Sequence, residues 1–367
     1  MSLFLVTGVA GFIGSKVADL LLQEGHRVHG LDNLNAYYDT RLKTWRLKQL
    51  APYETFSFER CDIEQSAELE LCAKRVGPVD AIIHLAALAG VRSSVINPKA
   101  YFGTNLLGTL NVLELCRACA IRKLVIASSS SVYGASRDLP YREDHDNCRP
   151  LSPYACSKRA AEDLCFTYHH LHQIDISILR FFTVYGPAGR PDMAAFRFVQ
   201  GVVECKALSI FGDGSQSRDF SFVGDIARGA VMALKKTGFR VFNLGASHPV
   251  TVNDALRMIE RLSGKTAVVQ HYPRDPSDVS DTWADVTRAK MELGWSPFVS
   301  LEEGLESALR WYMDNREWAC TLSAIDPQSE AISAREESKA TSQLLALSEA
   351  AGLQTQAAGQ STLLTVE

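Results

Sequence analysis

The feature of this sequence that most constrains its fold is a regular alternation of short apolar runs with longer amphipathic segments in the first half of the chain. Six runs are typical of buried strands: LFLVT (3–7), RVHGL (27–31), FSFER (56–60), AIIHLAA (81–87), KLVIASS (123–129) and DISILRFF (175–182). The gaps between them are long enough for helices. Strands that alternate with helices form parallel sheets, and near-continuous apolar strands are buried on both faces. The sequence therefore predicts an α/β fold with a doubly wound parallel sheet.

The pattern changes twice along the chain. From about residue 187 it loosens into shorter helices, isolated strands and polar turns, which indicates a smaller C-terminal domain that binds the substrate. We expect residues 1–186 to form the dinucleotide-binding domain, to which segments near 225–245 return, and residues 187–318 to form the second domain. Residues 319–367 drift to Ala, Ser, Gln and Glu without an aromatic anchor, so we expect a partly helical or disordered tail.

Composition excludes several classes of function. A net charge of -4 gives no concentrated basic face for nucleic acid. No run approaches the roughly 18 apolar residues of a membrane span, and the N-terminus lacks the basic leader of a signal peptide. Nine cysteines are scattered through periodic segments, as expected of reduced, mostly buried thiols. We therefore predict a cytoplasmic protein that contacts neither membrane nor nucleic acid.

A glycine motif lies between the first predicted strand and the first predicted helix. Gly8, Gly11 and Gly14 allow a tight turn and a close approach of the backbone, while the helix N-terminus offers free N–H groups to a pyrophosphate. Asp32 ends the second strand, where its carboxylate can bind the adenosine ribose and repel a 2′-phosphate. This Rossmann-type pattern predicts NAD as cofactor. Further cofactor contacts are expected from Phe12, Ile13, Asn33, Asp62, Ile63, Leu85, Ala86 and Ala87. Asp62 could equally be the N-cap of the following helix.

A second motif carries acid-base chemistry. SSSSVYG follows the fifth strand, and YACSK begins a long helix with Tyr154 and Lys158 four residues apart on one face. A neighbouring lysine cation and an oxidised nicotinamide would both lower the pKa of the Tyr154 phenol. Tyr154 is therefore a candidate general base, and a hydroxyl of the serine cluster can hold the same substrate oxygen.

Together these motifs resemble those of the extended short-chain dehydrogenase/reductases that act on nucleotide sugars. The likeness runs from the N-terminus to about Tyr312, and LDNLNAYYDTRLK, AALAGVRSS and RFFTVYGPAGRPDM are similar to the UDP-glucuronate 4-epimerases. The resemblance implies that Ser129 is the catalytic serine, with Ser128 and Ser130 as neighbours. It also implies that Lys158 binds the nicotinamide ribose and that Lys43 contacts a cofactor phosphate.

The same resemblance gives the loop after the sixth strand a role. An epimerase of this type oxidises C4 of the sugar, and with glucuronic acid the intermediate is a β-keto acid that can lose carbon dioxide. The carboxylate must be held out of alignment with the ketone. A planar arginine fork can bind a carboxylate through two charge-assisted hydrogen bonds. We therefore expect Arg190 and Thr183 to bind the carboxylate of the sugar.

Other polar residues are candidates for the uridine diphosphate and the sugar. They are Arg92, Ser130, Arg197, Arg218, Arg274 and Asp278. Ser277 replaces the glycine usual before Asp278 in this family, which puts the local turn in doubt. No metal is required.

The predicted activity is the interconversion of UDP-glucuronate and UDP-galacturonate. A UDP-glucuronate decarboxylase would share the first step, and a UDP-glucose 4-epimerase would leave Arg190 without a charge to meet. A non-catalytic dinucleotide-binding protein is the remote alternative, although such a protein would be expected to lose Tyr154 or Lys158. Resembling enzymes pair two long helices per subunit, so residues 101–119 and 154–170 would form a homodimer interface.

Overall fold

The computed structural model describes residues 1–145, 149–275 and 277–322. The described residues belong to the first of two units into which the chain divides, Met1–Ala324. The tail predicted over 319–367 therefore lies almost wholly outside the described residues.

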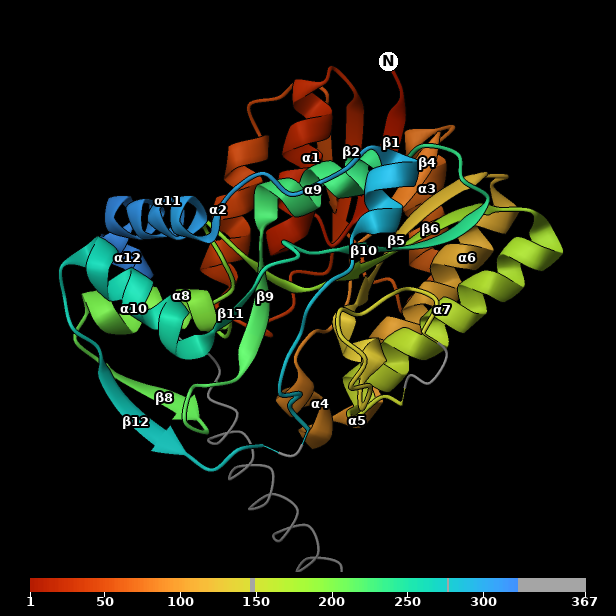
Figure 1. Cartoon of the computed structure of the whole chain (residues 1–367). Helices are drawn as coiled ribbons and strands as arrows, with labels where there is room; N and C mark the ends of the chain where they lie inside the picture. Colours follow the sequence, from red (N-terminus) through yellow and green to blue (C-terminus); the bar gives the residue numbers. More distant parts are fainter. Residues whose placement is uncertain (146–148, 276, 323–367) are drawn as a thin grey trace, which may run out of the picture. The chain divides into compact units, whose positions relative to one another are not determined.

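A seven-stranded sheet forms the centre of the first unit (Figure 1). Its strands, all parallel, run in the order β10-β6-β5-β4-β1-β2-β3. They are β1 (Leu3–Thr7), β2 (Arg27–Asp32), β3 (Phe56–Arg60), β4 (Ala81–His84), β5 (Lys123–Ser129), β6 (Asp175–Phe181) and β10 (Phe239–Leu244). The predicted doubly wound parallel sheet is confirmed, and β10 joins it at the edge beside β6.

Helices cover both faces of this sheet because alternate strand residues point to opposite sides. Phe4 and Val6 of β1 pack into one apolar cluster, whereas Leu5 packs into another. The first cluster includes residues of α1 (Phe12–Gln23) and α9 (Val223–Met232), beside which lies α2 (Thr40–Leu50). The second includes residues of α3 (Ser66–Val76), α6 (Gly108–Ala118) and α7 (Pro153–His172). Shorter helical segments are α4 (Val91–Ile96), α5 (Pro98–Phe102), two π-helices (Gly103–Leu107 and Ala289–Leu293) and a 3-10 helix (Ser130–Tyr133).

Segments after β6 build a second, smaller layer. β7 (Thr183–Tyr185), β9 (Ser217–Phe222) and β11 (Pro249–Thr251) form a three-stranded sheet, and β8 (Ala207–Phe211) pairs with β12 (Val268–Tyr272). The helices of this layer are α8 (Ala194–Val203), α10 (Val252–Ser263), α11 (Leu301–Asp314) and α12 (Arg316–Ala319). They share an apolar cluster with residues of α2, so this layer packs on a helix that also reaches the large sheet.

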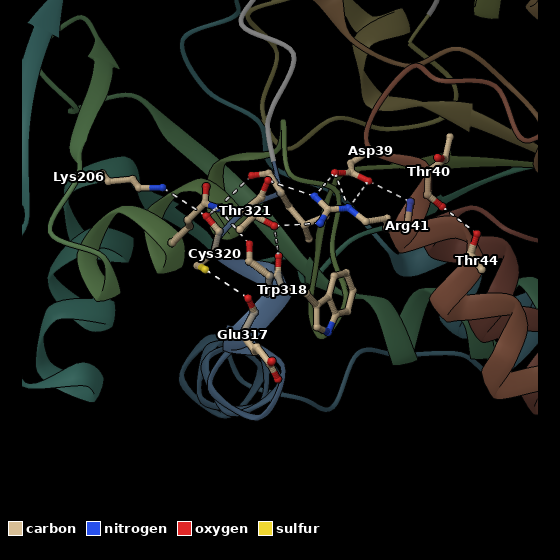
Figure 2. Close-up of polar contacts among 12 residues, drawn as sticks. Asp39, Thr40, Arg41, Thr44, Lys206, Glu317, Trp318, Cys320 and Thr321 are labelled. Atoms are coloured by element: carbon tan, nitrogen blue, oxygen red, sulfur yellow. Dashed lines mark hydrogen bonds and ion pairs between the residues drawn. The ribbon is translucent and has the colours of Figure 1, made fainter.

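The end of α12 is bound to α2 and to the region of α8 (Figure 2). Arg41 of α2 donates to the Thr321 hydroxyl at 3.0 Å and to the Thr321 carbonyl at 3.2 Å, while Lys206 donates to the Cys320 carbonyl at 3.3 Å. Asp39 caps α2 by accepting from the Arg41 backbone N–H. These contacts fix the start of α2, the helix that carries Lys43.

In the part of the chain that the structure describes, no helix is both long and apolar enough to cross a membrane.

Candidate functional site

A cavity of about 380 Å³ opens at the carboxyl ends of the central strands. It is lined by residues of β2, β5 and β6 and by the loops that follow β1, β2, β4, β5 and β6. The strand order reverses between β1 and β4, and ligands of open α/β sheets bind at such a switch point.

The glycine motif forms one wall of this cavity. Gly8 has φ +72°, and a Cβ there would lie 2.6 Å from the Ala86 nitrogen; a Cβ on Gly14 would lie 2.1 Å from the Gly8 oxygen. Gly11 precedes α1 without a side chain to cap the helix, so the first N–H groups of the helix remain for a ligand. Gly8, Gly11, Phe12, Ile13 and Gly14 all line the cavity. This cradle fits the pyrophosphate of a dinucleotide.

Asp32 and Lys43 lie together at the end of β2. The Asp32 carboxylate accepts hydrogen bonds from the backbone of Ala10 at 3.2 Å and Leu34 at 2.8 Å. The Lys43 ammonium lies 3.4 Å from the same carboxylate and 3.0 Å from the Asn35 amide oxygen. A buried carboxylate at this edge fits the adenosine ribose of NAD. Both side chains line the cavity, so Lys43 lies within the region expected of a cofactor contact.

Of the other residues predicted to contact the cofactor, all but Asp62 line the cavity. Asn33, Ile63, Leu85, Ala86 and Ala87 line the cavity, whereas Asp62 does not. The Asp62 carboxylate instead accepts from the Asn33 amide and from the Glu64 backbone, both at 3.0 Å. The alternative that Asp62 caps the next helix is wrong, because α3 has Gln65 at its N-cap position.

The start of α7 brings the catalytic candidates together. Ser152 caps this helix by accepting from the Ala155 backbone at 3.2 Å, and Pro153 occupies its first turn. Tyr154 and Lys158 are both buried and line the cavity with Ser129 and Ser130. The Lys158 ammonium donates to the Ala127 carbonyl at 3.0 Å, and the Ser129 Oγ accepts from the Ser131 backbone at 3.1 Å.

Burial dominates the titration of the catalytic pair. It raises the pKa of Tyr154, whereas the Ser129 hydroxyl and the Arg190 cation act in the opposite direction. Burial also lowers the pKa of Lys158 to about 8, so the ammonium still predominates at neutral pH. In the protein alone, desolvation outweighs the favourable charges, and the lowered Tyr154 pKa expected beside an oxidised nicotinamide stays a prediction.

Arg190 and Thr183 line the same cavity as Tyr154. The Nε and Nη2 atoms of Arg190 donate to the Asp192 carboxylate at 3.0 and 2.5 Å, and Nη2 also donates to the Ala89 carbonyl at 2.9 Å. Among the described residues no acceptor lies within hydrogen-bonding distance of Nη1. Asp192 thus occupies the Nε–Nη2 edge of Arg190, which could otherwise form two hydrogen bonds with the sugar carboxylate. The Nη1 atom is left for a ligand.

Arg218 and Asp278 also line the cavity, and their side chains form an ion pair at 2.9 Å. Arg92 does not line it. The Arg92 guanidinium lies 3.3 Å from Asp275 and 3.6 Å from Asp278, with its Cζ 3.6 Å from the centre of the Phe211 ring. In the protein alone, Arg92 therefore connects α4 to the second layer.

Two further predicted substrate residues, like Arg92, do not line the cavity. Arg197 lies half-buried in α8, and Arg274 is exposed and donates to the Ser280 hydroxyl at 2.5 Å. Neither stands at the end of a central strand, which is the position that brings Tyr154, Ser129 and Asp32 together.

Sequence reasoning missed three residues of α2 and the preceding loop. Tyr37 and Tyr38 line the cavity, and the Arg190 guanidinium lies 5.4 and 5.9 Å from the centres of their rings. Buried Arg46 donates to the carbonyls of Ala10 at 3.1 Å and Ala188 at 2.7 Å, and to the Tyr38 hydroxyl at 2.6 Å. Arg46 therefore joins the glycine loop to the loop that carries Arg190. The sequence did contain a signal for Tyr37 and Tyr38, because two adjacent tyrosines follow closely after the predicted second strand.

Comparisons with known proteins agree with this geometry. A model of the NAD dependent epimerase/dehydratase family matches residues 4–245. The UDP-glucuronate 4-epimerase of Thermodesulfobacterium geofontis is 48% identical over 318 residues, which cover 86% of this chain and 98% of that protein.

Solved structures of nucleotide-sugar epimerases are also similar to this chain. The UDP-glucuronic acid 4-epimerase of Bacillus cereus, in complex with UDP-glucuronic acid and NAD, is 38% identical with a TM-score of 0.81, covering 85% of this chain and 99% of that chain. The UDP-glucose 4-epimerase of Thermotoga maritima is 30% identical with a TM-score of 0.79, covering 86% and 99% respectively. The dinucleotide cradle, the Tyr154–Lys158 pair and these matches together show that the chain belongs to the NAD dependent epimerase/dehydratase family.

Proposed function

We propose that this protein is a UDP-glucuronate 4-epimerase that interconverts UDP-glucuronate and UDP-galacturonate through a 4-keto sugar. The observation that carries the proposal is Arg190, which presents an unpaired guanidinium edge to the cavity that also contains Tyr154. Asp192 already pairs with the guanidinium, so a sugar carboxylate would add a charged acceptor at the remaining edge, which a neutral sugar lacks. The curated relative at 48% identity has the same activity in its name.

The residues of the chain supply the acid-base chemistry. A bound NAD, held by the glycine turn, Asp32 and Lys158, would supply the hydride acceptor for C4 of the sugar and, once reduced, the hydride donor for its opposite face. Tyr154 takes the proton of the C4 hydroxyl, and the Ser129 hydroxyl holds the same oxygen. Lys158 favours the phenolate by its charge and binds the nicotinamide ribose. Tyr154 then returns the proton after the flat sugar has turned over.

Arg190 and Thr183 would restrain the sugar carboxylate while C4 is a ketone. A β-keto acid loses carbon dioxide when the breaking bond aligns with the carbonyl π system. The Nη1 edge of Arg190 and the Thr183 hydroxyl can fix both carboxylate oxygens away from that alignment. This restraint is what separates an epimerase from a decarboxylase that shares the first step.

The remaining cavity residues suit the nucleotide. We propose that Arg218 binds the diphosphate, that Asp278 binds the uridine ribose, and that Arg92 turns from its aspartate partners to the ligand. On this basis residues 1–186, with the returning strand β10, form the NAD domain, and residues 187–318 form the UDP-sugar domain. The roles predicted for Asp62, Arg197 and Arg274 remain predictions.

The test is an incubation of the purified protein with UDP-glucuronate, with and without added NAD, followed by proton NMR of the sugar nucleotides. UDP-galacturonate without pentose supports the proposal. UDP-pentose would identify a decarboxylase, and turnover of UDP-glucose alone would identify a neutral-sugar epimerase. The Tyr154→Phe variant should bind NAD but give no product.

We further propose that the enzyme is a cytoplasmic homodimer. Leu107 at the start of α6 and Phe166 and Leu171 of α7 are 47%, 55% and 63% exposed, and such apolar side chains suit a helix-pair interface. The eight cysteines described are free thiols, as suits a reducing compartment. Sedimentation equilibrium of the wild type and of Leu171→Glu would test the dimer.

A further inference from the structure

A buried ion pair lies one helical turn beyond Lys158. Glu162 of α7 accepts hydrogen bonds at Oε1 from the Ser128 hydroxyl at 2.5 Å and from Arg180 Nε at 3.0 Å. Its Oε2 accepts from Arg180 Nη2 at 2.7 Å. Glu162 is 6% exposed and Arg180 3%, so water does not screen this pair. The carboxylate lies outside the cavity lining and is not part of the mechanism proposed above.

The pair connects the three elements that form the catalytic centre. Glu162 belongs to α7, which carries Tyr154 and Lys158. Ser128 immediately precedes Ser129 at the end of β5, and Arg180 lies in the neighbouring strand β6. The Arg180 guanidinium also lies 4.8 Å from the centre of the Tyr133 ring. A carboxylate that binds both strands therefore sets the distance between Ser129 and the tyrosine–lysine face of α7.

Glu162 also contributes a negative charge close to the Lys158 ammonium. The titratable groups near the Lys158 ammonium include Tyr154, Glu162 and Cys165 on its own helix and His84 on β4. Burial raises the pKa of Cys165 and lowers the pKa of His84 to about 3, so both are neutral at working pH. Burial lowers the pKa of Lys158, and Cys165 and Glu162 oppose that shift. Because burial keeps the Cys165 thiol protonated, Glu162 is the anionic group among these neighbours, and its carboxylate is also paired with Arg180.

We propose that Glu162, held by Arg180 and Ser128, is a positioning residue that keeps the Lys158 ammonium charged and fixes Ser129 beside Tyr154. Its effect on turnover rests on the function proposed above, whereas its effect on Lys158 does not. Lys158 that loses its proton no longer supports the Tyr154 phenolate, so the alkaline limit of activity depends on Glu162.

The test measures Lys158 directly in the ligand-free protein. Lysine labelled with ¹³C at Cε is titrated by NMR, and the Lys158 signal is assigned by its loss in Lys158→Arg. In Glu162→Gln, which keeps the shape but removes the charge, the titration midpoint of Lys158 should fall by roughly one pH unit or more. Ser128→Ala removes a hydrogen bond without changing charge and should leave the midpoint within about 0.3 units.

Turnover supplies the second readout. The alkaline limb of kcat in Glu162→Gln should move to lower pH together with the Lys158 midpoint, and KM for the UDP-sugar should stay near the wild-type value. An unchanged Lys158 midpoint in folded Glu162→Gln would overturn the proposal. If wild-type protein turns over no UDP-sugar, the proposed function fails, but the NMR result still decides the role of Glu162.

A single change could prevent folding because it leaves Arg180 charged and unpaired in the interior. The double variant Glu162→Gln/Arg180→Met removes both charges, a replacement that buried ion pairs often tolerate. The Lys158 midpoint should again fall in this variant, although less far because a nearby cation is also lost. A folded double variant with the wild-type midpoint would show that the pair serves packing only.

Discussion

At the residue scale, recognition of the sugar depends on one edge of Arg190. Asp192, Ala89 and the rings of Tyr37 and Tyr38 fix the guanidinium, which limits the side-chain freedom lost when a ligand binds. Asp192 also lowers the net charge of the site, so a sugar carboxylate gains from the local hydrogen bond more than from long-range attraction. The arginine therefore acts by geometry as well as by charge.

Replacing Arg190 by Ala should raise KM for UDP-glucuronate roughly 10- to 100-fold, since a hydrogen bond to a charged group contributes about 1.5–3 kcal/mol. The share of decarboxylated product should also rise, because the carboxylate is no longer restrained. Product ratios by NMR measure both effects. Any residual turnover of UDP-glucose serves as the control and should change little. A UDP-glucuronate KM equal to that of wild type would refute the carboxylate role.

A second prediction at the residue scale tests whether Ser129 or Ser130 is the catalytic serine. The Ser129 hydroxyl lowers the pKa of Tyr154, so Ser129→Ala should raise that pKa and move the acid limb of the kcat profile to higher pH. Turnover at neutral pH should fall by roughly 10-fold or more. Ser130→Ala, which changes another cavity-lining hydroxyl, is the matched control. A larger loss in Ser130→Ala would reassign the catalytic serine by one position.

At the element scale, the β1–α1 turn links local geometry to cofactor binding. Gly8 lies against the residues that follow β4, and Gly11 and Gly14 at the start of α1 lie against the Gly8 carbonyl, so one methyl group at any of them has no space. The free N–H groups of the helix then face the cavity rather than a capping side chain. The turn, rather than any single side chain, makes the phosphate site.

Gly14→Ala should destabilise the protein by about 1–3 kcal/mol, because the new Cβ would force the Gly8 carbonyl to move. The same movement should reduce the amount of NAD that copurifies. Thermal unfolding and the absorbance of released cofactor measure the two effects. Lys16→Ala, on the exposed face of the same helix, should match wild type in both. Normal cofactor content in Gly14→Ala would mean that the turn tolerates rearrangement.

At the scale of the whole molecule, the apolar cluster of the second layer includes Leu322, which is buried. The second layer closes over α2 through Trp45, whose ring contacts Trp311 and Trp318 at 5.4 and 6.5 Å. The contacts of Arg41 and Gln200 with residues 319–322 complete that packing.

A chain that ends at Ala324 should therefore keep its turnover and its unfolding temperature within about 2 °C, the size of a minor change in stability. A shorter chain that ends at Asn315 removes Trp318 and the partners of Arg41, and it should unfold at a clearly lower temperature. Differential scanning calorimetry compares the two chains. Lost activity in the longer one would assign a role to the residues beyond 324.

Local patterns in the sequence were sufficient to predict the strands and the helix that position the site residues. The six predicted strands match β1 to β6 to within a few residues, because most of them are buried on both faces and have largely apolar sequences, although the edge strand β3 is only partly buried. In a parallel sheet all these strands end at one edge, so Asp32, Ser129 and the start of α7 meet without further information. Tyr154 and Lys158 share a helix face by spacing alone.

Only the tertiary structure decided which cations reach the cavity and which groups set their charge. Arg218 of β9 reaches it, whereas Arg92 of α4 is paired with two aspartates and Arg274, in a loop, is exposed. The Glu162–Arg180 pair and the contacts of Arg46 join residues far apart in the chain. The periodicity of a sequence indicates which face of a helix or strand is buried, but not which residues pack against that face. Burial and the neighbouring side chains determine the pKa values of Tyr154 and Lys158, so these values depend on the tertiary structure.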